Sequence, residues 1–312
     1  MIPDNRSSDA FWTQSARQLF CETVRYLEKK GERSYQELLN MALRISLKEL
    51  HQRLEGTNAS SLVDPAIDKT ALGIRASLGT SLRSLSVLQD TKEGFSLLKF
   101  PEQKEKKWLF LSCQPDQREL LKPLFSAWFS IVIKGLMRRV DGSPGRLWLI
   151  IDELASLNRL PSLLTGLAEV RKYGGCFVLG FQDLSQLEDI YSFSTTKTLS
   201  NLTGTKVLFR SADAEVANRV SRYLGEQEKQ EAQESISFGA HQMRDGVNLS
   251  TQKQTKAVVS GSEVMMLKDL DAFIKFPGEF PVSKISFKYL DLARKELAFI
   301  PNTAPLTRKE VS

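Results

Sequence analysis

Two adjacent carboxylates, Asp152 and Glu153, come directly after an apolar run, residues 146–151 (Arg-Leu-Trp-Leu-Ile-Ile). The run predicts a buried strand, and ligands of open α/β sheets bind at the carboxyl ends of strands. There Asp152 would hold Mg²⁺ through water, and Glu153 would orient or deprotonate an attacking water. The alternative is that the two acids only mark the point where a buried strand reaches the surface.

A second apolar run, residues 176–181, ends in Gln182, thirty residues after Asp152. Gln at such a strand end suits a residue that senses the γ-phosphate of a nucleotide. Two apolar runs that each end in a suitable polar residue support each other, although Gln182 alone would also fit the start of a helix.

Arg171 and Lys172 lie at the end of the helix expected between these two strands. Cations at a helix C-terminus complement the helix dipole, and this effect alone would explain the presence of both residues. The functional alternative is that Arg171 is an arginine finger that reaches the nucleotide of a neighbouring subunit.

The phosphate-binding loop G-x-x-x-x-G-K-[ST], which accompanies such residues in P-loop NTPases, does not occur in the 312 residues. The nearest segment, residues 73–80 (Gly-Ile-Arg-Ala-Ser-Leu-Gly-Thr), has the wrong spacing and no Lys. Backbone amides and this Lys hold the nucleotide phosphates. We therefore expect half of a nucleotide site, and no ATP hydrolysis by this chain alone.

Composition is that of a soluble globular protein, with 41% hydrophobic and 26% charged residues. The net charge of +6 permits a nucleic-acid partner but fits a well-solvated surface equally well. Cys21, Cys113 and Cys176 are widely separated, which indicates reduced, buried thiols in a cytosolic compartment. The two histidines are too few for a metal cluster. We expect no signal peptide, and the most apolar helix candidate, residues 120–137, is interrupted by charges.

The first ninety residues predict helices only. Apolar residues recur at the helical period from Phe11 to Leu27, and residues 34–37 (Ser-Tyr-Gln-Glu) form a capping box that would open a helix to about Leu50. A further helix is expected over residues 70–88. Residues 1–92 therefore predict an all-α domain.

From Gly94 the pattern changes to short apolar runs that alternate with helical segments, which is typical of a parallel sheet covered on both faces. Pro123 should kink or restart the helix in which it lies. The expected strands are 95–100, 108–112, 146–151, 176–181 and 206–209, and the expected helices are 115–139, 162–173 and 213–224.

The last third begins with a polar segment, residues 226–256, for which we expect a mobile loop or a hairpin. A helix over 262–270 and extended pieces at 272–275 and 283–289 would complete the domain of residues 93–292. Residues 293–312 carry prolines and charges and are expected to form a flexible tail.

Several motifs resemble conjugative type IV secretion coupling proteins of the TraD family. The specific ones are residues 147–157 (Leu-Trp-Leu-Ile-Ile-Asp-Glu-Leu-Ala-Ser-Leu), 167–175 (Leu-Ala-Glu-Val-Arg-Lys-Tyr-Gly-Gly) and 180–187 (Gly-Phe-Gln-Asp-Leu-Ser-Gln-Leu). Residues 278–282 (Gly-Glu-Phe-Pro-Val) and the N-terminal block continue the resemblance, which covers about residues 1–292.

The resemblance implies an α/β fold: an incomplete RecA-like P-loop NTPase parallel sheet plus an N-terminal all-α domain that faces DNA and the relaxosome. It implies ATP and Mg²⁺ as cofactors, and a hexameric ring at the cytoplasmic face of the bacterial inner membrane. Its partners would be single- and double-stranded DNA, the relaxase and the secretion channel. By position, Asp152 and Glu153 match the Walker B pair, Gln182 the third motif and Arg171 the inter-subunit finger.

The chain departs from that family because the membrane helices and the Walker A loop would lie upstream of its first residue. We therefore expect this chain to be soluble and cytoplasmic by itself, with one sheet edge exposed. Three alternatives stay open: a non-enzymatic DNA- or protein-binding adaptor or remnant, one piece of a motor completed in trans, or a DNA-pumping ATPase outside conjugation.

Overall fold

The structure is a computed structural model that describes residues 10–90, 94–103, 107–140, 145–237 and 246–293. The chain divides into two compact units, Met1–Leu199 and Ser200–Ser312. The predicted domain bounds, 1–92, 93–292 and 293–312, stay a prediction. Most of the expected tail lies outside the described residues.

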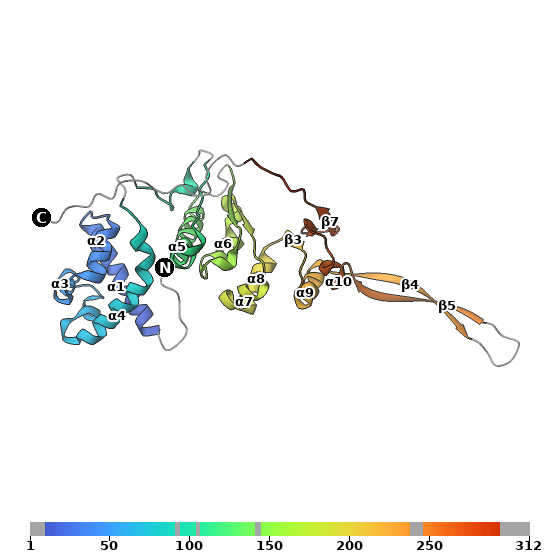
Figure 1. The fold of residues 1–312 in the computed structure, drawn as a ribbon, viewed down its shortest axis with the longest axis horizontal. Coiled ribbons are helices and arrows are strands. Elements are labelled where there is room, and N and C mark those ends of the chain that lie inside the picture. Colours follow the sequence, from blue (N-terminus) through green and yellow to red (C-terminus); the bar gives the residue numbers. More distant parts are fainter. Residues whose placement is uncertain (1–9, 91–93, 104–106, 141–144, 238–245, 294–312) are drawn as a thin grey trace. The chain divides into compact units, whose positions relative to one another are not determined.

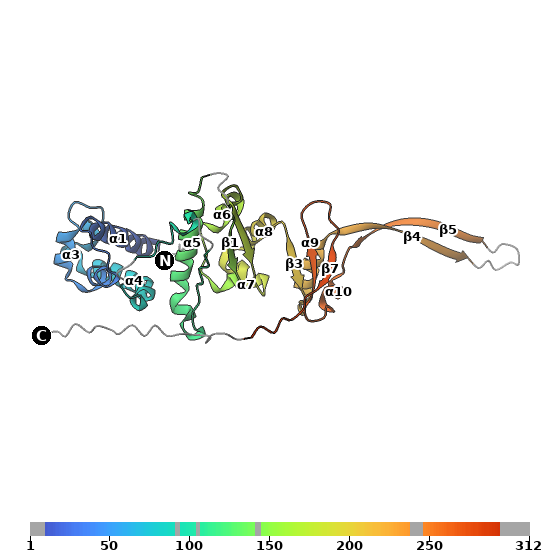
Figure 2. The same cartoon turned by 90° about the horizontal axis from the view of Figure 1, so that it is seen from above.

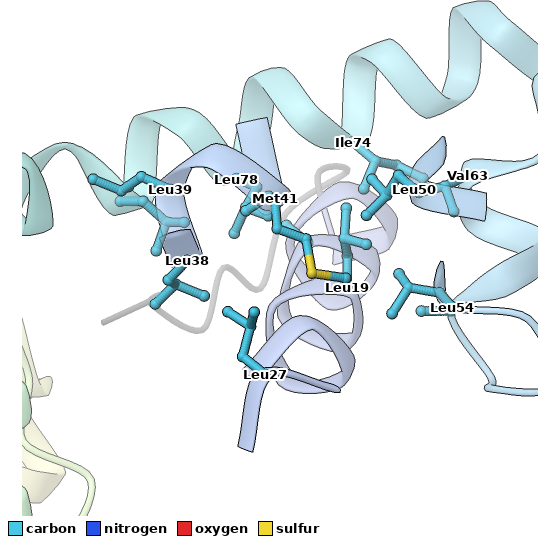
Figure 3. Close-up of a cluster of buried hydrophobic side chains, with 14 of the residues drawn as sticks. Leu19, Leu27, Leu38, Leu39, Met41, Leu50, Leu54, Val63, Ile74 and Leu78 are labelled. Carbon is cyan, nitrogen blue, oxygen red and sulfur yellow. The ribbon is translucent and has the colours of Figure 1, made fainter. Parts of the chain in front are cut away.

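The N-terminal part of the first unit consists of helices, as predicted (Figure 1). Its core is built from fully buried aliphatic side chains, among them Leu19, Met41, Leu50 and Leu78, which Figure 3 shows pointing into one cluster. The elements are α1 Ala10–Lys29, α2 Tyr35–Leu39, the π-helical turn η1 Asn40–Arg44, α3 Leu47–Arg53, the 3₁₀ turns η2 Ser60–Val63 and η3 Pro65–Ile67, α4 Asp68–Leu82, and the 3₁₀ turn η4 Arg83–Val87.

The helix expected from residue 34 to about residue 50 is instead three elements. Ser34 caps α2 as predicted, since its hydroxyl accepts the Glu37 N–H at 3.0 Å. The chain leaves the helix at Ile45, whose backbone is extended, and Ser46 caps the start of α3. A second N-cap inside the predicted helix therefore restarts it.

The strands expected at 95–100 and 108–112 are wrong in this structure. The described residues between 94 and 112 contain only the 3₁₀ turn η5 Phe100–Glu102. No described strand pairs with the residues of either expected strand. A 3₁₀ turn, η6 Pro115–Gln117, and α5 Arg118–Leu136 follow, and α5 continues through Pro123 rather than restarting there.

A parallel pair of strands forms the sheet of the first unit. β1 Leu147–Ile151 lies beside β2 Gly175–Leu179, with Leu147 opposite Gly175 and Ile151 opposite Leu179. Between the two strands in sequence come the 3₁₀ turn η7 Leu154–Ser156, helix α6 Leu163–Glu169 and the 3₁₀ turn η8 Val170–Tyr173. Helices α7 Leu184–Tyr191 and α8 Phe193–Leu202 follow β2 in sequence, and Figure 2 labels them together with β1 and α6.

One face of this sheet is buried and the other is not. Leu149 and Ile151 on β1 are 4% exposed and belong to the apolar clusters formed with the helices. Trp148 and Ile150 alternate with them and are each 55% exposed. The expectation of cover on both faces is therefore wrong for the described residues.

The second unit contains an antiparallel sheet of order β3-β6-β7, made of Lys206–Phe209, Asp271–Lys275 and Ser283–Ser286. The strand expected at 206–209 is confirmed, but its pairing is antiparallel with β6 and not parallel with β2. Helices α9 Ala214–Leu224 and α10 Gly261–Met265 contribute to an apolar cluster with Phe273 of β6. The polar segment forms a hairpin of β4 Glu226–Ser237 and β5 Gly246–Ala257.

Candidate functional site

The ends of β1 and β2 are joined to each other beyond the last strand residues. The Gly180 N–H donates to the Ile151 carbonyl at 2.8 Å, and the Leu154 N–H donates to the Gly180 carbonyl at 2.8 Å. These two bonds carry the pairing past the sheet, so the backbone of Asp152 and Glu153 is fixed beside the end of β2.

Gly180 allows this close approach because it has no side chain. A Cβ atom at position 180 would lie 2.2 Å from the Asp152 carbonyl oxygen, where no real Cβ fits. A glycine inside an apolar strand pattern is a recognised sign of close backbone approach, so Gly180, within the run 176–181, was a signal that our prediction did not use.

The two carboxylates differ in their surroundings. Asp152 is exposed at the end of β1, whereas Glu153 is half-buried. The Glu153 carboxylate accepts the Ala155 N–H at 3.3 Å, and its carbonyl accepts the Ser156 hydroxyl at 2.7 Å. Glu153 is thereby held against η7, whose N-terminus it caps.

Gln182 lies at the same end of the sheet as the carboxylates, three residues beyond β2, and is exposed. Its neighbour Asp183 caps α7 by accepting the Ser185 N–H at 2.8 Å. The structure therefore brings Asp152, Glu153 and Gln182 to one edge, and it gives the role of helix cap to Asp183.

Arg171 lies at the other end of β2. It is an exposed residue of η8, which precedes the first residue of β2, so the whole strand separates it from Gln182. Gly174, in a left-handed conformation with φ of 78°, ends this turn. Arg171 is not brought to the carboxylates of its own chain.

Two side chains that the sequence analysis missed hold the loop after the carboxylates. The Ser126 hydroxyl of α5 accepts the Asn158 N–H at 2.9 Å, and the Tyr191 hydroxyl of α7 accepts the Leu160 N–H at 3.2 Å. Burial raises the pKa of the Tyr191 hydroxyl. Each bond spans some thirty residues of sequence, so no local pattern predicts it.

The residues at this edge fit a magnesium nucleotide only in part. Mg²⁺ is usually bound by one or two carboxylates together with phosphates and waters. The exposed Asp152 carboxylate is suited to this task. The phosphates themselves need the amides and the Lys of a loop that the sequence lacks. In the described ranges no group of three or more His, Cys, Asp or Glu side chains is gathered as a metal site.

A parallel pair of strands with helices, acidic and amide residues at its carboxyl edge, and an N-terminal helical region define an α/β protein, and its structural match to TrwB makes this fold RecA-like. The sequence profile of the type IV secretion-system coupling protein DNA-binding domain matches residues 1–288. The chain belongs to this family.

Comparison with known proteins gives the same result. The coupling protein TraD of Escherichia coli (strain K12) is 35% identical over 96% of this chain and 43% of its own length. The bacterial conjugative coupling protein TrwBdeltaN70 in its unbound form matches with a TM-score of 0.82 and 29% identity over 96% of this chain and 68% of its own. The plasmid coupling protein TrwB in complex with ADP and Mg²⁺ matches with a TM-score of 0.80 and 29% identity, at the same coverage.

The chain spans less than half the length of TraD and about two thirds of the TrwB chain. Over the parts that the structure describes, no helix is both long and apolar enough to span a bilayer.

Proposed function

We propose that this chain is the all-α and Walker B part of a conjugative coupling ATPase, which links the relaxosome to a type IV secretion channel and drives DNA translocation with ATP. The observation that carries the proposal is the gathering of Asp152, Glu153 and Gln182 at the carboxyl edge of the sheet. The similarity to TrwB, which binds ADP and Mg²⁺, supports it.

Each residue has a proposed role at this edge. Asp152 would hold Mg²⁺, which supplies charge compensation for the phosphates when bound. Glu153 would orient the attacking water, and it must first leave the Ala155 N–H that it now accepts. Gln182 would contact the γ-phosphate. Its exposure and its position at the same edge of the sheet as the two carboxylates support this role.

Arg171 is proposed to act on the nucleotide of a neighbouring subunit. Its exposure at the opposite end of β2 supports action in trans over action in its own chain. This role requires a ring, for which we propose the hexamer of the family, with the relaxase, DNA and the channel as partners at the cytoplasmic face of the inner membrane. Residues 1–92 would face DNA and the relaxosome, and residues 93–292 would belong to the motor.

The phosphate-binding half of the site has to come from outside these 312 residues. The exposed apolar face of β1 and β2, which carries Trp148, Ile150 and Val178, supports a motor domain completed by further elements. Exposed apolar patches of this kind are usually covered by another part of the assembly.

The test is a chimera in which this chain replaces the matching segment of E. coli TraD. We expect the purified chimera to hydrolyse ATP, and Glu153→Gln to lower turnover by at least about 10²-fold because it removes the water-orienting carboxylate. Glu119→Gln, an exposed Glu on α5, is the matched control and should leave turnover unchanged.

Equal turnover by the chimera and its Glu153→Gln variant would contradict the proposal. An adaptor would instead show salt-sensitive DNA binding without any dependence on nucleotide.

A further inference from the structure

A polar hollow of about 610 Å³ opens on the surface of the helical region. Its walls come from the end of α1, the loop that follows, α2, the π-helical turn η1 and α3. It is separate from the carboxyl edge of the sheet, and nothing in the proposed nucleotide chemistry uses it.

Part of the lining of the hollow consists of charges that are already compensated within the protein. Arg53 pairs with Glu49 at 2.7 Å and lies 3.6 Å from Glu37. The other oxygen of Glu37 accepts the side-chain amide of Asn40 at 3.4 Å. Both oxygens of Glu37 and the guanidinium of Arg53 are thus engaged within the protein.

Two further cations of the lining, Arg44 and Lys30, have no carboxylate partner among the described residues. Arg44 is exposed, and among the described residues no carboxylate pairs with it. Lys30 is exposed too, with its ammonium 5.8 Å from the centre of the Tyr26 ring. Glu32 is an exposed acidic residue of the same lining. The charged groups left for a ligand are therefore two cations and one carboxylate.

Hydrogen bonds hold the backbone of the turn that carries Arg44. The Ile45 N–H closes the π-helical turn by donating to the Asn40 carbonyl at 3.1 Å. The half-buried Arg75 of α4 donates to the carbonyls of Ala42 at 3.2 Å and Ile45 at 2.8 Å. π-Helical turns are rare and often mark functional sites. Holding the turn in this way reduces the ordering cost of binding.

We propose that this hollow binds a short acidic segment of a partner protein, with a carboxylate of that segment on Arg44 and Lys30. Arg presents a planar fork that matches a carboxylate. The side-chain amides of Gln36 and Asn40 carry both donors and acceptors, which suits a peptide backbone.

The charges of the hollow favour a peptide over DNA. A nucleic-acid groove is a continuous positive stripe, because affinity comes from phosphates. Here Glu32 lies among the cations of the lining and would repel a polyanion, whereas Glu37 is already engaged by Arg53 and Asn40. A peptide with one or two acidic residues brings much less negative charge to Glu32 than a polyanion does.

The test is fluorescence anisotropy with the whole chain, without nucleotide, and a fluorescein-labelled peptide of Glu, Ser and Gly. We expect Arg44→Ala to weaken binding about tenfold, the usual effect of losing one charge-assisted hydrogen bond. The affinity of the Arg44→Lys variant should lie between those of the unmodified protein and Arg44→Ala, because Lys keeps the charge but lacks the planar guanidinium. Arg25→Ala, an exposed Arg of α1 that pairs with Glu22 at 2.6 Å, is the matched control.

Four results would overturn the inference: no binding at low salt, equal weakening by Arg44→Ala and Arg25→Ala, preference for the peptide with Lys in place of Glu, or binding of labelled oligo-dT with the same dependence on Arg44. Lys30→Ala gives a second, independent variant. Since nucleotide is absent, failure here leaves the proposed ATPase role standing, and failure of that role leaves this site standing.

Discussion

Asp152 sits beside Gly180, and the space between their backbones leaves no room for a side chain. We predict that Gly180→Ala lowers the free energy of unfolding by about 1–3 kcal/mol, because the new methyl group must displace the backbone of Asp152. Thermal or urea unfolding followed by Trp fluorescence measures this change. Gly79→Ala in α4 is the control: its nearest neighbour is a Leu43 methyl at 3.7 Å, so it should stabilise by about 0.5–1 kcal/mol.

The Tyr191 hydroxyl gives a second test at the level of single residues. In Tyr191→Phe the buried Leu160 N–H loses its acceptor, which should cost about 1–3 kcal/mol. Tyr289→Phe, at a position 80% exposed, should cost almost nothing. Equal unfolding midpoints for the two variants would show that the bond does not hold the loop after the carboxylates.

Strands β6 and β7 are linked through one acidic side chain. The Asp271 carboxylate accepts the Ser286 hydroxyl at 2.6 Å and pairs with Lys284 at 3.0 Å. The Ser286 hydrogen bond, followed by that of Lys284, lowers the pKa of Asp271 below its ordinary value. A carboxyl with a lowered folded pKa stabilises the fold above its unfolded pKa of about 4. That stability is lost as pH falls through the folded pKa.

We therefore predict that Asp271→Asn destabilises this sheet at neutral pH, and that the difference from the unmodified protein shrinks as pH falls below about 4. The NMR signals of Ile274 and Ile285, followed through urea unfolding at several pH values, measure the stability of this sheet. Asp269→Asn, 84% exposed and paired with Arg210, is the control and should show a much smaller difference. A difference that does not change with pH would contradict the assignment.

Among the helices and strands, the sequence predicted the elements that the local residue pattern determines. The continuous apolar runs before Asp152 and Gln182 became the parallel pair β1 and β2. The runs at 95–100 and 108–112 have similar composition but form no strand, because a strand needs a partner and composition does not supply one. For the same reason the strand at 206–209 was predicted, while its antiparallel pairing with β6 was not.

Of the two sites in the molecule, the sequence predicted the sheet edge at which Asp152, Glu153 and Gln182 lie, since strand ends and polar residues are both local signals. It did not predict the hollow around Arg44. That site depends on a π-helical turn held by Arg75, some thirty residues further along the chain. Contacts between residues this far apart in the sequence depend on tertiary packing, and no local sequence pattern predicts them.

We propose that this chain supplies the Walker B half of a coupling protein, and conjugative DNA transfer is the activity that depends on this half. The measurement is the conjugation frequency of cells in which the TraD chimera replaces TraD. We expect transfer with the chimera, its loss with Glu153→Gln, and normal transfer with Glu119→Gln, all at equal protein levels. Transfer by Glu153→Gln at the frequency of the chimera would contradict the account.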